Sequence, residues 1–202
     1  MFVLVTGGSG SGKSEYAEGR VLKFGDEKRY YIATMMCFDK ESQKRVERHR
    51  KMRAGKGFET VERYLNLKDL ELPEAREEDE TATAFDQSQE KMTGQAGKKK
   101  EGITVLLECM SNLTANEVFD PAGSGVGAAQ EIKTGIDRLI GTCDNLVVVT
   151  NELFSDGISY DPETEKYLQV LGEVNCYMAE LADEVVEVVY GIPVYHKGGV
   201  HS

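Results

Sequence analysis

Several features that would mark other classes of protein are missing from this chain of 202 residues. Its four cysteines, Cys37, Cys109, Cys143 and Cys176, lie far apart, with no C-x-x-C pair and no histidine at metal-ligand spacing. This spacing indicates neither a zinc site nor a disulfide framework, so we expect reduced, partly buried thiols.

Long apolar runs are missing as well. No segment approaches the roughly 18 consecutive apolar residues that a membrane span requires. The first apolar segment begins almost at Met1, which leaves no charged region and cleavage site of the kind found in secretion signals. We therefore expect no membrane span and a cytoplasmic location.

Basic residues are too few to give a positive balance. The chain has 24 Lys and Arg against 35 Asp and Glu, which gives a formal net charge of -11. A polyanion would be repelled by this charge unless a local basic patch dominated, so general nucleic-acid binding is disfavoured.

The opening residues contain a phosphate-binding motif. An apolar run over 2–5, which we expect to be a buried strand, leads directly into the pattern G-x-x-x-x-G-K-[ST]. Glycines let backbone N–H groups crowd around phosphate oxygens, the lysine supplies a cation, and the final serine supplies a hydroxyl for Mg²⁺. Apolar residues at helical spacing follow, as the motif requires. We expect a nucleoside triphosphate to bind to Gly7, Gly8, Ser9, Gly10, Ser11, Gly12, Lys13 and Ser14.

Apolar runs alternate with helical patterns along the chain, and the length suits one domain with a full core. The run over 103–108 is largely apolar, as in a parallel sheet that helices cover on both faces. We predict an α/β fold of the P-loop NTPase class (RecA-like), with a mostly parallel central sheet flanked by helices. The predicted strands cover residues 2–5, 29–34, 58–62, 103–108, 145–151 and 184–190.

Helices are predicted after the phosphate-binding motif, over 40–53, after a glycine-rich connection at 121–127, and from Pro162. The helix over 40–53 lacks an apolar stripe, so something other than core burial should explain it. A turn at 191–193 should lead into a short tail, and residues 74–100 should form a polar, mobile surface insertion. The inward stripes of the last two helices comprise Ala129, Ile132, Ile136 and Leu139, and then Tyr167, Leu171, Val174, Met178 and Leu181.

Glu108 ends the apolar strand at 103–108, far in sequence from Ser14. A carboxylate in this place resembles the acidic residue that helps to hold Mg²⁺ in phosphate-loop enzymes. The alternative is a solvated carboxylate at a strand end. We favour a metal site formed by Ser14 and Glu108, because this fold brings such a strand beside the loop.

The helix over 40–53 places His49 between two cations, because helical spacing stacks Arg45, His49 and Arg53 along one face. Nearby positive charge disfavours protonation of the imidazole, which leaves a neutral, nucleophilic ring, and the same cations could grip a triphosphate. From spacing alone, a solvated basic helix face with an incidental histidine explains the pattern better. His196 and His201 are interpreted as incidental.

Taken together, these segments resemble the bifunctional adenosylcobinamide kinase/adenosylcobinamide-phosphate guanylyltransferase family, which builds the nucleotide loop of vitamin B12. So many matches in order, through most of the chain, are far more specific than the phosphate-binding motif alone. The matching segments are 4–8, 11–14, 31–34, 60–62, 106–109, 148–152, 157–158, 182–185 and 191–193, together with Arg45, Val46, His49, Arg53, Asn116, Leu171, Gly172 and Asn175.

The resemblance implies that His49 is the nucleophile that becomes guanylylated, with Lys13 as the other catalytic residue. It also implies that Glu62 contacts the nucleotide, that ATP and GTP are substrates with Mg²⁺, and that the acceptor is the corrinoid adenosylcobinamide. The family forms homotrimers, so the same assembly is expected here. The chain departs from the family at Gly10, where many relatives have Arg, and at 53–58, where they have Arg-Pro-x-x-Trp.

Two other interpretations stay open. Another small-molecule kinase with this loop would bind a triphosphate without forming an adduct on His49. A third interpretation is a non-catalytic nucleotide-dependent switch or assembly module, because such a loop indicates binding more securely than turnover. A Ras-like switch is disfavoured, since residues 150–153 lack the Asn/Thr-Lys-x-Asp motif that reads guanine.

Overall fold

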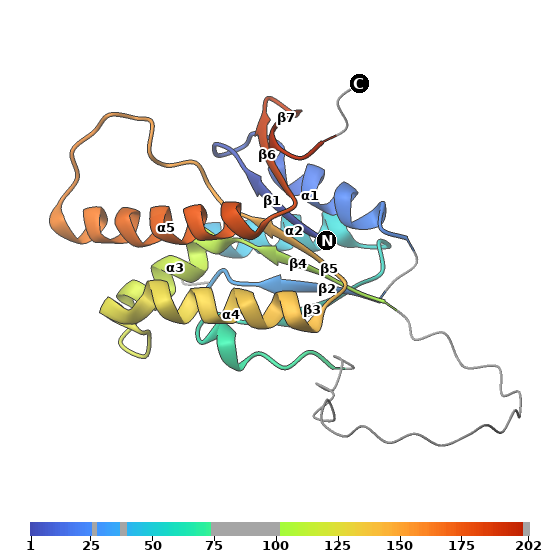
Figure 1. The fold of residues 1–202 in the computed structure, drawn as a ribbon, viewed down its shortest axis with the longest axis horizontal. Helices are drawn as coiled ribbons and strands as arrows, with labels where there is room; N and C mark the ends of the chain where they lie inside the picture. Colours follow the sequence, from blue (N-terminus) through green and yellow to red (C-terminus); the bar gives the residue numbers. More distant parts are fainter. Residues whose placement is uncertain (26–27, 37–39, 74–101, 200–202) are drawn as a thin grey trace, which may run out of the picture.

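The fold of the chain is given by a computed structural model (Figure 1). It describes residues 1–25, 28–36, 40–73 and 102–199, without the side chains of residues 41, 42, 45, 48, 49 and 52. The predicted insertion at 74–100 lies outside the described residues, as do Cys37 and His201.

The described strands form one seven-stranded sheet in the order β3-β2-β4-β5-β1-β6-β7. Every neighbouring pair is parallel except β6 with β7, which confirms the predicted α/β fold with a mostly parallel sheet. This order places β5 between the two strands that precede the predicted phosphate and metal sites, β1 and β4. The strands are β1 (Phe2–Thr6), β2 (Lys28–Ala33), β3 (Phe58–Glu62), β4 (Ile103–Glu108), β5 (Asn145–Val149), β6 (Glu184–Val189) and β7 (Ile192–Lys197).

Helices cover both faces of the sheet (Figure 1). Helices α3, α4 and α5 pack on one face, and α1 packs on the other. Short 3₁₀ turns, η1 (Leu67–Asp69) and η2 (Gly125–Gly127), pack beside α4. The helices are α1 (Lys13–Leu22), α2 (Lys40–Arg53), α3 (Met110–Phe119), α4 (Ala128–Thr142) and α5 (Pro162–Leu181).

Strand β1 shows why both faces need a cover. Phe2 and Leu4 belong to the core beneath α4 and α5, whereas Val3 and Val5 point to the opposite core beneath α1. Burying each such side chain contributes about 1.5–3 kcal/mol, so a strand apolar on both sides is stable only when it is sandwiched.

The predicted stripes of α4 and α5 are largely confirmed, because Ile132, Ile136, Leu171 and Met178 are all buried. Leu181 is an exception, since 43% of it is exposed. It is the last residue of α5, where the chain turns away toward β6, so the stripe ends one turn earlier than predicted.

The tail predicted after residue 193 is wrong, because Ile192–Lys197 forms strand β7, antiparallel to β6. Tyr190 and Gly191 both have positive φ, 51° and 80°, and they form the tight two-residue turn between these strands. All six residues of β7 are exposed, so the strand lacks the alternation that would have revealed it.

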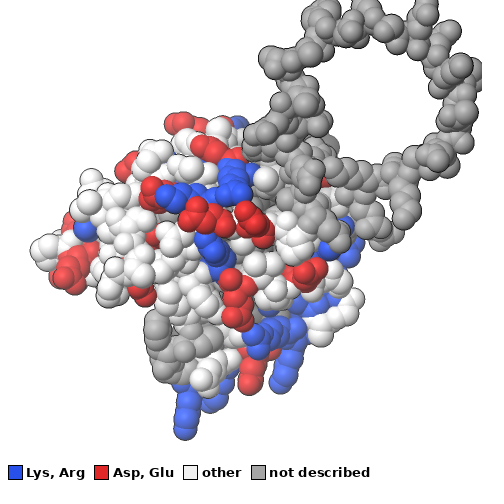
Figure 2. All heavy atoms as spheres, turned by 90° about the horizontal axis from the view of Figure 1, so that it is seen from below, with Lys and Arg blue, Asp and Glu red and all other residues white. Residues whose placement is uncertain are grey.

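Charges of both signs are interspersed on the face of the molecule shown in Figure 2. Among the described residues, Nζ of Lys133 lies 2.7 Å from a carboxylate oxygen of Glu173, and Nζ of Lys68 lies 2.5 Å from one of Glu131. None of the helices that the structure describes has the length and apolar character of a membrane span.

Candidate active site

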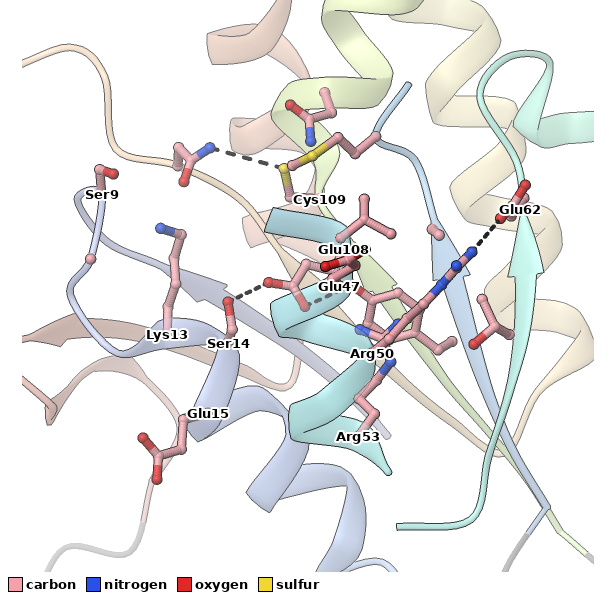
Figure 3. Close-up of a pocket in the computed structure, with 18 of the residues that line it drawn as sticks. Ser9, Lys13, Ser14, Glu15, Glu47, Arg50, Arg53, Glu62, Glu108 and Cys109 are labelled. Atoms are coloured by element: carbon pink, nitrogen blue, oxygen red, sulfur yellow. Dashed lines mark hydrogen bonds and ion pairs between the residues drawn. The ribbon is translucent and has the colours of Figure 1, made fainter. Parts of the chain in front are cut away.

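The carboxyl ends of β1, β4 and β5 meet the start of α1 and one side of α2 around a cavity of about 880 Å³. The phosphate-binding loop lines one side of this cavity, and α2 lines another with Gln43, Val46, Glu47 and Arg50. The polar character of α2 is thereby explained, because part of its surface borders a cavity instead of a core (Figure 3).

Glycine is required by the shape of the loop at two positions. Gly7 has a φ of 151°, and a Cβ there would lie 2.6 Å from the carbonyl oxygen of Val188. Gly12 has a φ of 94° and begins α1, with its Cβ position 3.3 Å from Cα of Gly191. The loop backbone therefore lies in close contact with the end of β6, where a side chain would not fit. The loop leads directly into the N-terminus of α1, and a helix N-terminus attracts anions.

Lys13 lies over the loop, where its Nζ donates a hydrogen bond to the carbonyl oxygen of Gly8 at 3.0 Å. Burial lowers the pKa of Lys13 from its usual range, while the nearby Cys109 and Glu108 act in the opposite direction. A phosphate group beside Lys13 would supply the negative charge that partly offsets this desolvation.

Ser14 and Glu108, far apart in sequence, are in direct contact. The Ser14 hydroxyl donates a short hydrogen bond to Oε1 of Glu108, and the Tyr31 hydroxyl donates to Oε2 at 3.0 Å (Figure 3). The glutamate is 9% exposed, so it is not the freely solvated carboxylate of the alternative interpretation.

The oxygen atoms of Ser14 and Glu108 fit Mg²⁺. This ion prefers oxygen ligands and is usually bound by one or two protein groups together with substrate phosphates. Ser14 Oγ and the Glu108 carboxylate supply such oxygens beside the loop. Within the described part of the chain, no group of three His, Cys, Asp or Glu residues could hold a metal. The role of Ser14 and Glu108 as metal ligands stays a prediction.

On the α2 side of the cavity, Arg53 is buried against Tyr31, with its Cζ 3.3 Å from the ring centroid. Arg50 pairs with Glu62 at 3.1 Å, and Glu62 also accepts a hydrogen bond from Tyr64 at 2.8 Å. Arg50, Arg53 and Glu62 therefore gather at the same cavity as the loop (Figure 3).

The backbone of His49 lies in α2, four residues before Arg53, and that of Arg45 lies one turn earlier. The side chains of both residues are outside the described part of the structure, so the predicted stacking of Arg45, His49 and Arg53 is untested. His196 lies elsewhere, on β7, and pairs with Glu187 at 2.9 Å.

Further polar side chains beside the cavity come from the segments that follow β4 and β5. Asn151 follows β5, lines the cavity, and donates to Ser111 Oγ at 2.5 Å. Ser111 in turn lies 3.1 Å from the sulfur of Cys109, where burial raises the pKa of the thiol. Of these groups, Ser111 lies in α3 and Cys109 directly precedes it. Helix α3 was not predicted, although its buried residues Met110, Leu113 and Glu117 recur at helical spacing.

Asn116 has a supporting position within α3. Its Nδ2 donates to the carbonyl oxygens of Thr34 at 2.9 Å and of Tyr64 at 3.0 Å. One side chain thus ties together the segments that leave β2 and β3, which keeps the carboxyl edge of the sheet in register with α3.

Comparison with solved structures finds distant similarity to several proteins, including a flagellar accessory protein and a secretion-system ATPase. The flagellar accessory protein FlaH from Methanocaldococcus jannaschii gives a TM-score of 0.41 with 9% identity, over 98% of this chain and 78% of that one. A prototypical ATPase from the type III secretion system of pathogenic bacteria gives 0.46 with 8% identity, over 99% and 59%. Similarity at this level indicates no activity.

Sequence comparison is far more specific. The chain is 32% identical to the bifunctional adenosylcobalamin biosynthesis protein CobU of Escherichia coli (strain K12) and 30% identical to that of Salmonella typhimurium (strain LT2). Each alignment covers 98% of this chain and 100% of the relative. A family model matches residues 3–87 and 76–195. The chain therefore belongs to the cobinamide kinase/cobinamide phosphate guanyltransferase family, whose members are transferases of cobalamin biosynthesis.

Proposed function

We propose that this protein phosphorylates adenosylcobinamide with ATP or GTP and then transfers GMP from GTP to the product, giving adenosylcobinamide-GDP. The observation that carries the proposal is the family match over nearly the whole chain. The cavity supports it, because the phosphate-binding loop and the helix that bears His49 line the same space.

In the kinase step, the loop backbone and Lys13 hold the triphosphate. Ser14 and Glu108 would hold Mg²⁺, which neutralises charge on the β- and γ-phosphate oxygens when bound. The hydroxyl oxygen of the cobinamide aminopropanol arm forms a bond to the γ-phosphorus, the bond from that phosphorus to the nucleoside diphosphate breaks, and the hydroxyl proton is released. Catalysis comes mainly from positioning and charge, since the loop and Lys13 are placed before the substrate arrives.

In the guanylyl step, a ring nitrogen of His49 attacks the α-phosphorus of GTP, and pyrophosphate leaves with the electrons of the broken P–O bond. The resulting phosphoramidate then transfers GMP to an oxygen of adenosylcobinamide phosphate, which restores the neutral imidazole. Because the transfer is divided into two steps, GTP and adenosylcobinamide phosphate, which are both polyanions, need not meet directly. The proposed nucleotide contacts on the α2 side of the cavity are Arg53, which is buried, and Glu62 on β3.

The assembly and location are part of the same proposal. By resemblance to the family, the protein is a homotrimer, and it acts in the cytoplasm on small-molecule substrates. No nucleic-acid partner is proposed, in keeping with the net charge of -11.

Turnover of adenosylcobinamide tests the proposal directly. With Mg²⁺ and γ-labelled ATP or GTP, we expect label in adenosylcobinamide phosphate, and with α-labelled GTP we expect label in adenosylcobinamide-GDP. The Lys13→Ala variant should lose the first product. If neither product forms while another small molecule is phosphorylated, the chain is a different kinase with the same loop. If nucleotide binds and no acceptor is modified, it is a binding module.

A further inference from the structure

Tyr31 contacts Glu108 through its hydroxyl and Arg53 of helix α2 through its ring. It lies on β2, paired between β3 and β4, and is 4% exposed. Its hydroxyl donates to Oε2 of Glu108 at 3.0 Å, while Ser14 donates to Oε1. Both carboxylate oxygens are therefore held, each by a donor from a different element.

The ring of Tyr31 also has well-defined contacts, on its face and at its edge. The Arg53 guanidinium lies over the ring at 3.3 Å, and Phe58 packs edge-on with a centroid distance of 6.3 Å. Stacking of a largely desolvated guanidinium on an aromatic face is favourable, so the ring fixes Arg53, the last residue of α2. Nη1 of Arg53 is buried without a hydrogen-bond partner among the described residues, while the side chain lines the cavity.

The hydroxyl of Tyr31 acts only as a donor to the carboxylate. Burial, followed by the negative charge of Glu108, raises the pKa of Tyr31 above its usual range.

We propose that Tyr31 is a positioning residue shared by both halves of the site: its hydroxyl orients Glu108 beside Ser14, and its ring orients Arg53 and the end of the helix that carries His49. The inference rests on the proposed function only for the identity of the two reactions. Its physical content concerns Mg²⁺-dependent nucleotide binding and the order of α2, and both can be measured without a corrinoid.

The hydroxyl is tested with Tyr31→Phe, and Tyr30→Phe is the matched control. Tyr30 is the preceding residue, is fully buried, and donates to the carbonyl oxygen of Pro73 at 3.3 Å from the opposite face of the sheet. Calorimetric binding of GTP is measured across a Mg²⁺ titration. Tyr31→Phe should raise the Mg²⁺ concentration for half-maximal enhancement about ten-fold, as expected for a lost hydrogen bond to a charged group. Its affinity for GTP without Mg²⁺ should not change.

A Mg²⁺ dependence in Tyr31→Phe equal to that of wild type, or equal to that of Tyr30→Phe, would overturn the role of the hydroxyl. The Glu108→Gln background supplies a second comparison. If Tyr31 acts through Glu108, then Tyr31→Phe should add little in that background, whereas an undiminished effect would show that it acts by another route.

The ring is tested by amide hydrogen exchange of the free protein. Tyr31→Leu removes the platform beneath Arg53, while Tyr31→Phe retains it, so exchange over residues 50–57 should rise several-fold in the first variant and not in the second. Arg53→Lys keeps the charge but loses the planar stack, and it should resemble Tyr31→Leu. Equal exchange in Tyr31→Phe and Tyr31→Leu would overturn the role of the ring.

Failures of the two proposals are distinguishable. Normal Mg²⁺-dependent GTP binding that shifts as expected in Tyr31→Phe, without any corrinoid turnover, would contradict the proposed function and support the role of Tyr31. Corrinoid turnover by the wild type with no shift in Tyr31→Phe would do the reverse. If Tyr31→Phe does not fold, as judged by circular dichroism, Arg53→Lys still decides whether the stack orders α2.

Discussion

Among single residues, Glu108 has the clearest chemical consequence, because its two oxygens accept hydrogen bonds from Ser14 and Tyr31 beside the phosphate-binding loop. Glu108→Gln keeps the size of the side chain but removes the negative charge. We expect Mg²⁺-dependent kinase turnover to fall at least about 100-fold, because a fixed electrostatic group near the transferred phosphate is lost. Steady-state rates measured at saturating Mg²⁺ check this.

Glu59→Gln is a suitable control for that experiment. Glu59 lies on β3, is exposed, and pairs with Lys28 at 3.8 Å, an interaction of little energetic value. Rates close to wild type are expected for this control. Turnover by Glu108→Gln that equals turnover by Glu59→Gln would show that Glu108 has no part in the chemistry.

Asp161 has a structural role that can be predicted at the same scale. It is the N-cap of α5 and accepts hydrogen bonds from the backbone N–H groups of Glu163 at 3.0 Å and Thr164 at 3.1 Å. Asp161→Ala should lower the midpoint of thermal unfolding by about 2–4 °C, the usual effect of losing a cap in a chain of this size. Asp161→Asn should retain most of the cap.

The effect of Asp161 should depend on pH in a defined direction. The side-chain hydroxyl of Thr164 is the main cause that lowers the pKa of Asp161, and the backbone N–H of Thr164 adds to it. A lowered pKa stabilises the folded state above the unfolded value, which is about 3.9 for Asp, and this contribution disappears as the pH falls through the folded value. The difference between wild type and Asp161→Ala, measured from pH 7 to pH 3, should therefore shrink below about pH 4. A constant difference would contradict this.

Among elements, the contact of α4 with η1 gives a sharp packing test. A Cβ on Gly135 of α4 would lie 2.8 Å from Cβ of Leu67, whereas Gly141 in the same helix has no atom within 4 Å of its Cβ position. Gly135→Ala should destabilise the protein by about 1–3 kcal/mol through overpacking, despite better helix propensity. Gly141→Ala should be neutral or stabilising by up to about 1 kcal/mol. Urea unfolding of both variants measures this difference, and equal values would be inconsistent with the close packing.

The elements also show where sequence patterns carry information. Helix α2 could be predicted from its helix-forming residues, and its missing stripe correctly signalled that it does not serve the core alone. Strand β7 could not, because it is an exposed edge strand without alternation, and its pairing depends on the turn at Tyr190 and Gly191. Helix α3 was not predicted, although only Cys109 separates it from β4 and its buried residues recur at helical spacing.

For the molecule as a whole, the phosphate-binding motif and the buried strands were sufficient to predict the fold class. They did not determine strand order, and hence could not reveal that β5 separates β1 from β4. The contact of Ser14 with Glu108 was anticipated through the fold class, whereas the role of Tyr31 was not, since its partner lies 77 positions further along the chain. Such pairings depend on tertiary register, which a local pattern does not encode.

The assembly is a prediction at this scale. The protomer has a mass of 22.4 kDa, so the mass obtained from sedimentation should be about three times that value for a homotrimer. Sedimentation velocity over a range of protein concentrations measures this. A single species at the protomer mass throughout the range would contradict the trimer.

The central claim is that one chain carries a phosphate-binding loop for the kinase and a histidine for the guanylyl transfer. Its most direct test is an intact-protein mass spectrum after incubation with Mg²⁺ and GTP, with ATP and the His49→Ala variant as controls. We predict an acid-labile adduct of one GMP, formed with GTP and not with ATP, and absent from His49→Ala. A folded protein that binds GTP and forms no adduct, or one that forms it equally well in His49→Ala, would contradict the claim.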